Sequence, residues 1–595
     1  MRERVGLFVR YYCFWVLFFV LQKPVFMACQ YGLLGDVRWT DWFLVPWHGM
    51  PLDLSVSAYI TVVYGVLLCV SVWAKGAWLQ WAARVYTALV LAVAMLVVLA
   101  DNGCFPSWGY HLDKDVFAYL ATPREVFACA PWWQWVLGVG CWLLGVGFWL
   151  WVAERLRLTA YGVQERPVVT TAVLVVLTAL LFLPMRGSVS VSTMNTGRAY
   201  YSPNRMLNLA AVNPLFNIME SLSENRFDSS RYHYMPSDEA AEVLSAIRPD
   251  SGSPGEQILN TSRPNIVLVV LESFCKTAWE AMPNLRSLSS EGVYFSNIYA
   301  NSYRTDRGLV AILGAFPGGA SGSVMLVPSK SQNLPQIGQV LKADGYDLRF
   351  YYGGDEDFTN MRSYLVTGGF EQRVSDHDFP LSDRLSKWGV PDHIVFDYAA
   401  RSIVRHASST TNPLFAVVLS LSSHEPFDVP YHHYAHPYLN AVAYTDSCLG
   451  AFVDSLRQSP MWENTVVVLT ADHGYPYPQG LANYAPLRYG IPLVMAGGAV
   501  RGPREIKTLG SQIDWVPTLL HQMDMEAEQF AFAKDLLDTV RAPYAYYHFV
   551  DGFAYITDSD TTIIDRCAEG VQNTDRCADR HKAEAVTQRI YESLD

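Results

Sequence analysis

The chain carries little charge for its length. Asp, Glu, Lys and Arg make up 17% of 595 residues, against about 25% in soluble domains, so part of the chain is expected in a membrane. The 44 basic residues are outnumbered by 56 acidic ones, which argues against a nucleic-acid-coating protein. Ten cysteines are too few for a disulfide scaffold of this size. Glycine and proline number 40 and 32 and aromatics reach 13%, which excludes a collagen-like or disordered chain.

Long uncharged runs are present instead, and nearly all of them precede Met185. A membrane-spanning helix needs about 20 apolar residues, because no backbone amide stays unpaired in hydrocarbon. The sequence predicts a transmembrane domain over residues 1–185 with five such helices. Their approximate ranges are 8–28, 54–74, 83–101, 132–153 and 167–185. The first is interrupted at Lys23, which we expect at the interface or facing the bundle, and a cleaved signal peptide is the alternative interpretation.

The basic residues in the short loops favour a cytoplasmic N-terminus. With that orientation, eight Lys and Arg residues lie inside and four outside, as the positive-inside rule requires. Five helices then place everything after Met185 outside the cytoplasm. Cys104 and Cys129 fall in one outside loop, and Cys567 and Cys577 near the C-terminus. Each pair could form a disulfide in an oxidising compartment, and two unrelated thiols are the alternative for the second pair.

Three segments follow the membrane domain. Residues 186–262 read as a linker with partly interfacial helices, such as the amphipathic stretch 206–221. Residues 263–557 alternate buried-type strands with helices, which predicts an α/β domain with a mostly parallel sheet. Its expected strands are 265–271, 347–352, 414–421, 465–470 and 491–496, its expected helices 309–316, 334–344 and 514–523, and its expected hairpin 544–557. Residues 558–595 are a polar C-terminal extension that we expect to be peripheral.

Metal-type ligands follow two of the expected strands. Glu272 comes directly after 265–271, and Asp472-His473 comes after 465–470. In α/β sheets, functional groups collect at the carboxyl ends of the strands, so these side chains could hold a divalent cation. A loop-bonding role is the alternative for each. Thr305 precedes the expected helix 309–316, where metal contact would activate its hydroxyl as a nucleophile; a helix N-cap is the alternative.

Several motifs in order resemble a known group of enzymes. They are Val-Val-Leu-Glu272-Ser-Phe, the Thr305 loop, Ser423-His424-Glu-Pro-Phe, Ala-Asp472-His473-Gly, the segment 511–519, and Asn208 to Phe216 in the linker. From about 263 to 523 the chain is similar to the alkaline phosphatase–sulfatase superfamily. As a whole it resembles the lipoteichoic acid synthases and related membrane phosphoglycerol or phosphoethanolamine transferases. Sulfatase activity itself is disfavoured, because Ser302-Tyr-Arg-Thr-Asp does not fit the formylglycine motif.

The resemblance implies an N-terminal five-helix transmembrane bundle plus an extracytoplasmic sulfatase-like domain with a mostly parallel central sheet. It implies a metal-dependent phosphotransferase of the bacterial cytoplasmic (inner) membrane. The implied metal ligands are Glu272, Thr305, Asp472 and His473, around one ion, Mn²⁺ before Zn²⁺ or Mg²⁺. The implied substrate-binding residues are His424, Arg362, Asn360 and Arg304; the family's arginine aligns one position before Arg362, at Met361.

The implied reaction begins with attack by Thr305 on a phospholipid donor, phosphatidylglycerol or phosphatidylethanolamine. The headgroup would pass through a phospho-threonine intermediate to an extracytoplasmic glycan or glycolipid acceptor. Two other functions stay open. One is a membrane phosphatase or phosphodiesterase that passes the group to water. The other is a non-catalytic lipid-sensing regulator, which the nucleophile beside a metal cage speaks against.

Overall fold

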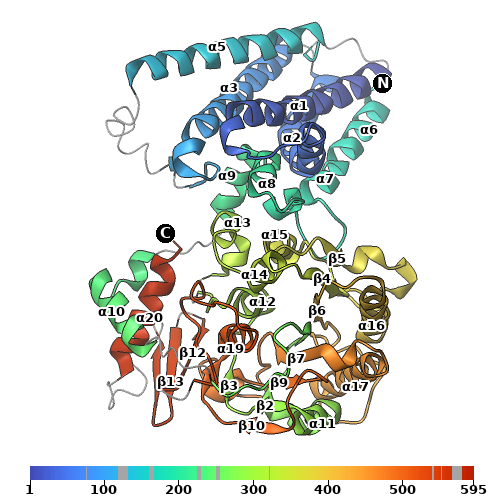
Figure 1. The fold of residues 1–595 in the computed structure, drawn as a ribbon. Coiled ribbons are helices and arrows are strands. Elements are labelled where there is room, and N and C mark those ends of the chain that lie inside the picture. Colours follow the sequence, from blue (N-terminus) through green and yellow to red (C-terminus); the bar gives the residue numbers. More distant parts are fainter. Residues whose placement is uncertain are drawn as a thin grey trace. The chain divides into compact units, whose positions relative to one another are not determined.

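In the computed structural model, the described residues are 1–74, 77–114, 116–117, 131–159, 166–223, 229–248, 255–319, 322–538, 542–550, 552–565 and 579–594. The chain forms two compact units, residues 1–224 and 225–595, and each is described by itself (Figure 1). Cys129, Cys567 and Cys577 lie outside the described residues, so the expected disulfides stay predictions.

Unit 1 is a bundle of apolar helices. They are α1 (Arg2–Cys29), α2 (Asp41–Trp73), α3 (Ala77–Trp108), α5 (Trp132–Arg155), α6 (Pro167–Leu180) and α7 (Phe182–Arg186). Within the described residues, five helical segments are long and apolar enough to cross a membrane, with α6 and α7 together forming the fifth. The five-helix part of the predicted fold class is confirmed. Most observed helices extend beyond their predicted ranges; α2, for example, begins at Asp41, 13 residues before the predicted start at residue 54.

Lys23 interrupts the apolar pattern of α1 because it has a partner inside the bundle. The side chains of Lys23 and Asp53 are 3% and 0% exposed, and Lys23 Nζ lies 2.5 and 2.7 Å from the two carboxylate oxygens. Asn213 Nδ2 donates to Asp53 Oδ1 at 2.8 Å. Of the two expected positions for Lys23, the structure shows the one that faces the bundle. The pairing offsets the cost of burying both charges.

The linker is divided between the units. The amphipathic stretch 206–221 contains two helices, α8 (Arg205–Ala211) and α9 (Pro214–Ser223), both in unit 1. The break falls at Asn213-Pro214, where Asn213 Oδ1 accepts from the backbone N–H groups of Leu215 and Phe216 and so caps α9. The next helix, α10 (Ser237–Ile247), belongs to unit 2.

Eight strands form the main sheet in the described part of unit 2. Their order is β10 (Arg504–Ile506), β2 (Val293–Phe295), β9 (Leu493–Ala496), β7 (Thr465–Ala471), β1 (Asn265–Leu271), β6 (Leu414–Leu419), β4 (Asp347–Tyr352) and β5 (Gln372–Val374). Only β9 runs antiparallel to its neighbours within this sheet. The prediction of a mostly parallel sheet is confirmed. The central strands β1, β6 and β7 are rich in β-branched residues and almost wholly buried, as strands covered on both faces must be.

Two groups of helices pack around this sheet (Figure 1). In one, α17 (Pro437–Arg457) contacts both α11 (Pro283–Glu291) and α16 (Asp392–Ser409). In the other, α12 (Thr305–Gly314) contacts both α14 (Ile337–Ala343) and α19 (Trp515–Gln522). Both α14 and α16 also reach β4, so β4 and its neighbours are shielded from water by helices.

The strand expected at 491–496 is split by Pro492. Its first part is β8 (Gly490–Ile491), which pairs with β3 (Ile298–Tyr299) in a three-stranded sheet completed by β11 (Gly510–Ser511). Its second part is β9 of the main sheet. Proline has no N–H to donate to a ladder, so the pairing changes at this residue.

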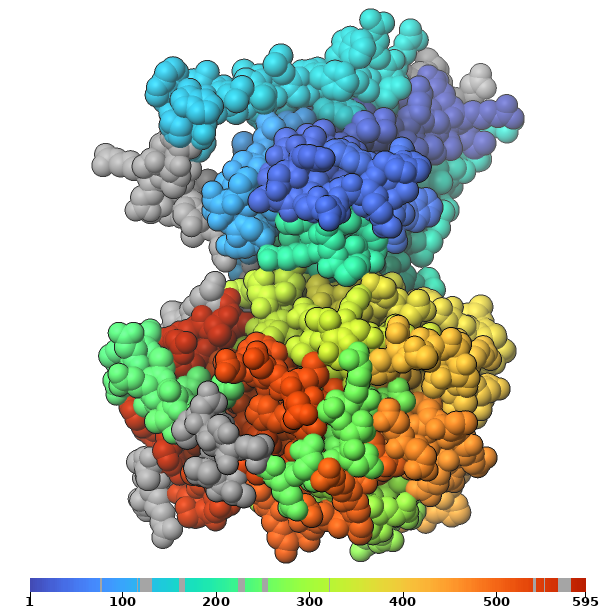
Figure 2. Space-filling view, viewed as in Figure 1, coloured from blue at the N-terminus to red at the C-terminus, as the bar shows by residue number. Residues whose placement is uncertain are grey.

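The C-terminal segment is not the peripheral extension that we expected. The hairpin of β12 (Tyr544–Phe549) and β13 (Gly552–Thr557) gains a third strand, β14 (Thr561–Asp565). Helix α20 (Arg580–Glu592) packs against α10 and β13, and Figure 2 shows α10 and α20 adjacent at the surface. Ala583, Val586 and Ile590 join the hydrophobic core. Their helical spacing on an otherwise polar helix was the missed signal.

The buried Lys23–Asp53 pair gives a test of unit 1. Replacing Asp53 with leucine leaves Lys23 buried without a counter-ion, and we expect the free energy of unfolding to fall by about 3–5 kcal/mol. The double variant Lys23→Met/Asp53→Leu removes both charges and should be more stable than the single variant. Thermal unfolding of the full chain in detergent measures both. A double variant less stable than Asp53→Leu alone would contradict the pairing.

Candidate active site

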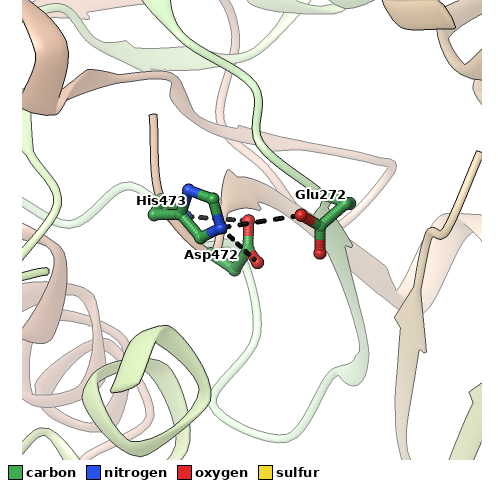
Figure 3. Close-up of side chains that lie close together, drawn as sticks. All are labelled: Glu272, Asp472 and His473. Carbon is green, nitrogen blue, oxygen red and sulfur yellow. Dashed lines mark hydrogen bonds and ion pairs between the residues drawn. The ribbon is translucent and has the colours of Figure 1, made fainter. Parts of the chain in front are cut away.

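The sheet brings two carboxylates together at one edge. Strands β1 and β7 are parallel neighbours with Leu271 opposite Ala471, so the residues that follow, Glu272 and Asp472, leave the sheet side by side. His473 completes the group (Figure 3). Its Nε2 atom lies 3.5 Å from Glu272 Oε1 and 3.5 Å from Asp472 Oδ2. One ligand atom from each residue lies within 4.8 Å of the others, a spacing that could hold a metal ion.

The hydroxyl of Thr305 adjoins this group. Its Oγ1 atom donates to Glu272 Oε2 at 3.0 Å. The sequence placed Thr305 ahead of a helix beginning at Leu309, whereas α12 begins at Thr305 itself and Arg304 occupies the N-cap position. Thr305 therefore lies in the first helical turn, near the positive end of the helix dipole. The structure thus brings together the four residues expected to bind metal: Glu272, Thr305, Asp472 and His473.

We call the group of Glu272, Asp472 and His473 the cage. Helix α12 lies close to this cage because residue 308 is glycine. A Cβ atom at Gly308 would lie 2.3 Å from the backbone carbonyl oxygen of Asp472. On the other side, Ser273 adopts a left-handed conformation with φ of 59°. Its N–H donates to Asp472 Oδ1 at 2.8 Å and its hydroxyl to Glu272 Oε1 at 2.7 Å. These two bonds orient the carboxylates and hold the strained residue in place.

Two side chains to which the sequence assigned no role fix the backbone of the cage. Ser420 Oγ accepts from the Glu272 N–H at 2.8 Å. Gln512 Nε2 donates to the carbonyls of Ala471 and Asp472 at 2.5 and 2.8 Å. Such contacts depend on tertiary folding, because Gln512 lies 40 residues from Asp472 in the chain. The one available signal was a hydroxyl residue, Ser420, directly after a buried strand.

The cage has an unbalanced charge. Glu272 and Asp472 are both buried, and burial raises the pKa of each carboxyl group above its usual range. For Asp472 the pKa rises to about 7, with the charge of Glu272 adding to the effect of burial. In the described part of the chain, Asp472 Oδ2 has no hydrogen-bond partner. An orphaned carboxylate oxygen beside a second carboxylate, an imidazole and a hydroxyl is a donor set that fits a divalent cation.

His424 is connected to the cage through Glu425 and Tyr475. Tyr475, two residues after His473, donates its hydroxyl proton to Glu425 Oε1 at 3.0 Å. His424 Nδ1 donates to the Glu425 carbonyl at 2.9 Å, and the same carbonyl accepts from Trp388 Nε1 at 2.6 Å. The rings of Trp388 and His424 are 4.1 Å apart. The predicted headgroup contact of His424 stays a prediction.

Arg362 and Asn360 make their described contacts within their own part of the fold. Arg362, on α15 (Met361–Thr367), pairs with Asp357 at 2.6 Å and Glu356 at 3.0 Å. Asn360 has φ of 62°, and its Nδ2 donates to the Leu326 carbonyl at 3.1 Å. Two carboxylates already neutralise the guanidinium, so a phosphate would have to compete with them. Arg304 is exposed. The substrate roles of these three residues stay predictions.

A second group of metal-type side chains lies beyond β4. One ligand atom each from Asp355, Asp357 and His377 lies within 4.8 Å of the others. Asp357 is already paired with Arg362 at 2.6 Å, and Asp355 Oδ1 accepts from the Asp357 N–H at 2.9 Å. Among the described residues, these three lack the orphaned oxygen that marks the cage. The cage of Glu272, Asp472 and His473 is therefore the better metal site.

Comparisons with known proteins agree with this geometry. Residues 264–525 match the sulfatase family. Phosphoglycerol transferase I of Xanthomonas campestris pv. campestris is 27% identical over 311 residues, covering 48% of this chain and 44% of that protein. The lipoteichoic acid synthase-like protein YvgJ of Bacillus subtilis is 21% identical over 408 residues, covering 61% of this chain and 64% of that protein. The matched part thus spans only about half to two thirds of these relatives.

A solved structure shows the same fold. The crystal structure of the lipoteichoic acid synthase LtaP from Listeria monocytogenes superposes with a TM-score of 0.51 at 18% identity. The superposition covers 60% of this chain and 97% of that chain. The sulfatase-like α/β part of the predicted fold class is therefore confirmed.

The charge imbalance of the cage predicts how the metal-free protein responds to pH. Native Asp472, with a pKa of about 7, binds a proton more tightly than the unfolded chain, whose Asp pKa is 3.8. Stability should therefore fall as pH rises through that window. Asp472→Asn should flatten this fall, whereas the exposed control Asp454→Asn should not. Melting temperatures of the full chain in EDTA, taken across this pH range, test the expectation; equal slopes for the native protein and Asp472→Asn would contradict it.

Proposed function

We propose that the chain is a membrane phosphotransferase, since residues 264–525 match the sulfatase family. It moves a phosphoglycerol-type headgroup from a phospholipid donor to an extracytoplasmic glycan or lipid acceptor. The observation that carries the proposal is the Thr305 hydroxyl bonded to Glu272 in a cage of carboxylates and an imidazole. The names of the two relatives, a phosphoglycerol transferase and a lipoteichoic acid synthase-like protein, support the substrate class.

The cage residues have separate roles in the proposal. Glu272, Thr305, Asp472 and His473 hold one divalent metal ion, for which we favour Mn²⁺ over Zn²⁺ or Mg²⁺. When bound, such an ion lowers the pKa of a coordinated hydroxyl and offsets the charge of a phosphate. Thr305 Oγ1 would bond to phosphorus while the P–O bond to diacylglycerol breaks, and the leaving oxygen would take a proton from water. Glu272 Oε2, which accepts the hydroxyl's hydrogen bond, is placed to receive its proton.

An acceptor hydroxyl completes the cycle by displacing Thr305 from phosphorus, so the two substrates react in turn. The apolar helices of unit 1 suit a donor that resides in a bilayer, because they keep the domain at the membrane surface. The distribution of Lys and Arg in the loops supports an orientation with unit 2 outside the cytoplasm. The bacterial relatives support the bacterial cytoplasmic (inner) membrane as the location. Phosphatidylethanolamine as donor is the other outcome that the same experiment distinguishes. Water as acceptor is the alternative that a labelled headgroup, followed with and without a glycan acceptor, would separate from transfer.

Substitution of the nucleophile tests the proposal. Thr305→Val keeps the side-chain shape and removes the hydroxyl, so we expect turnover to fall at least about 10³-fold. Thr305→Ser should retain part of the activity, and Thr561→Val on β14 should be without effect. The full chain in lipid nanodiscs is incubated with phosphatidylglycerol or phosphatidylethanolamine, and released diacylglycerol is measured.

Mass spectrometry of the Thr305 peptide then identifies the donated group. A phosphoglycerol adduct on the native protein supports the proposed donor, and a phosphoethanolamine adduct assigns the other one. Unchanged diacylglycerol release from Thr305→Val would refute the nucleophile assignment. Absence of release from the native protein with either lipid would refute the transferase.

A further inference from the structure

The segment 379–388 of unit 2, which we call the leucine loop, presents two apolar side chains to solvent. Leu381 and Leu385 are 80% and 64% exposed. Among the described residues of unit 2, they are the two most exposed of six large apolar side chains that are neither buried nor half-buried. The other four are Phe358, Tyr398, Leu487 and Val550. Two of these, Phe358 and Tyr398, contact the ends of the loop, so exposed apolar side chains gather at one place on unit 2.

Aromatic contacts fix both ends of the leucine loop. At one end, the ring centroids of Phe379 and Tyr398 are 5.3 Å apart. At the other end, the ring centroids of Trp388 and Phe358 are 5.9 Å apart. Trp388 Nε1 also donates to the Glu425 carbonyl at 2.6 Å. The two leucines are therefore carried by a segment that is anchored on either side of them.

The middle of the loop is held in one conformation as well. It begins with a 3₁₀ turn, η9 (Leu381–Asp383). Arg384 Nη1 follows and lies 3.2 Å from Asp376 Oδ2. Ser386 Oγ then accepts from the Gly389 N–H at 3.1 Å. Single exposed leucines are common on soluble proteins, but an ordered loop that keeps two of them away from the core marks an interaction surface.

The other residues of the loop suit a membrane surface. Lys387 is exposed, and its Nζ atom lies 5.5 Å from the centroid of the Trp388 ring. Lysine and tryptophan are at home where lipid meets water, because each joins an apolar body to a polar tip. The loop has little net charge, since Arg384 is paired with Asp376 and Lys387 is balanced by Asp383. Its contact with a partner is therefore apolar rather than electrostatic.

A bilayer is an apolar partner that accompanies this chain. The described part of unit 1 has five helical segments long and apolar enough to cross a membrane, and unit 2 follows them in the same chain. A tethered surface meets lipid at high effective concentration, so two leucines are enough for a contact that a free domain would not keep. The loop also adjoins the candidate active site, because the rings of Trp388 and His424 are 4.1 Å apart.

We propose that the leucine loop is a lipid-contact site, in which Leu381 and Leu385 insert among the lipids of the bilayer that holds unit 1. Lys387 then lies at the level of the headgroups, and the loop keeps the His424 side of the active site close to the membrane surface. The insertion depends only on the membrane helices of this chain. Its benefit, delivery of a donor lipid to Thr305, rests on the proposed function.

Photocrosslinking tests the insertion without turnover. The full chain is placed in phosphatidylcholine nanodiscs with p-benzoylphenylalanine in place of Leu381, Leu385 or the control Val550. Val550 is 51% exposed in the turn between β12 and β13, which Figure 1 shows on the side of unit 2 away from β5 and α16. After irradiation, mass spectrometry counts lipid adducts on each peptide. We expect adducts at 381 and 385 to exceed those at 550 by about tenfold, because only the loop reaches acyl chains.

Two outcomes of this experiment would overturn the proposal. One is an equal yield of lipid adducts at all three positions, and the other is adducts that join two copies of the chain in place of lipid. Phosphatidylcholine is not the proposed donor and no reaction is measured. Failure of the crosslinking therefore leaves the transferase proposal standing, and absence of turnover leaves the adducts as evidence for the contact.

A kinetic comparison tests what the contact does for the reaction. In the double variant Leu381→Ser/Leu385→Ser, we expect the apparent KM for long-chain phosphatidylglycerol in nanodiscs to rise about tenfold while kcat is unchanged. The KM for dihexanoyl-phosphatidylglycerol, which reaches the site from water, should equal the native value. Val550→Ser should change neither KM. An unchanged KM for the long-chain lipid, or an equal rise for both lipids, would refute delivery of the donor by a surface contact.

Discussion

The placement of two buried carboxylates at the ends of adjacent parallel strands is the constraint on which the catalytic unit depends. Glu272 and Asp472 come together only because β1 and β7 pair in a fixed register. Their mutual repulsion and burial make the cage unfavourable without a cation. Hydrogen bonds with Ser273, Ser420 and Gln512 nevertheless keep the two carboxylates and their backbone in place. Much of this part of the fold therefore serves to keep an electrostatically costly arrangement in place.

The sequence predicted the parts of the molecule that depend on local pattern. Continuous apolar runs located the five helices, and β-branched runs located β1 and β7 with the ligands that follow them. Strand pairing was harder to predict. The strand expected at 491–496 is split at Pro492 because its two halves join different sheets. The spacing of Ala583, Val586 and Ile590 in the sequence indicates the buried face of α20. We did not predict it, because the segment as a whole is polar. Gln512 lies in the motif 511–519, but its contact with the cage could not be predicted, because it exists only after distant segments meet.

The arginines illustrate the same limit. Arg304 and Arg307 lie on either side of Asp306 and Thr305 in the sequence, and only the structure separates them: Arg304 is exposed, whereas Arg307 is buried. Arg362, which the sequence favoured as a phosphate ligand, is already paired with Glu356 and Asp357. An arginine in the sequence therefore suggests an anion site, but only the folded structure shows whether carboxylates already compensate its charge.

The missing side chain at Gly308 has a mechanical consequence. Because α12 rests directly on the Asp472 backbone, with no intervening Cβ, its first turn has little freedom to tilt. That turn bears the Thr305 hydroxyl, which donates to Glu272. A side chain at residue 308 would push α12 away from the Asp472 backbone and carry the Thr305 hydroxyl away from Glu272 with it. The distance between the hydroxyl and the two carboxylates is therefore limited by an absent methyl group.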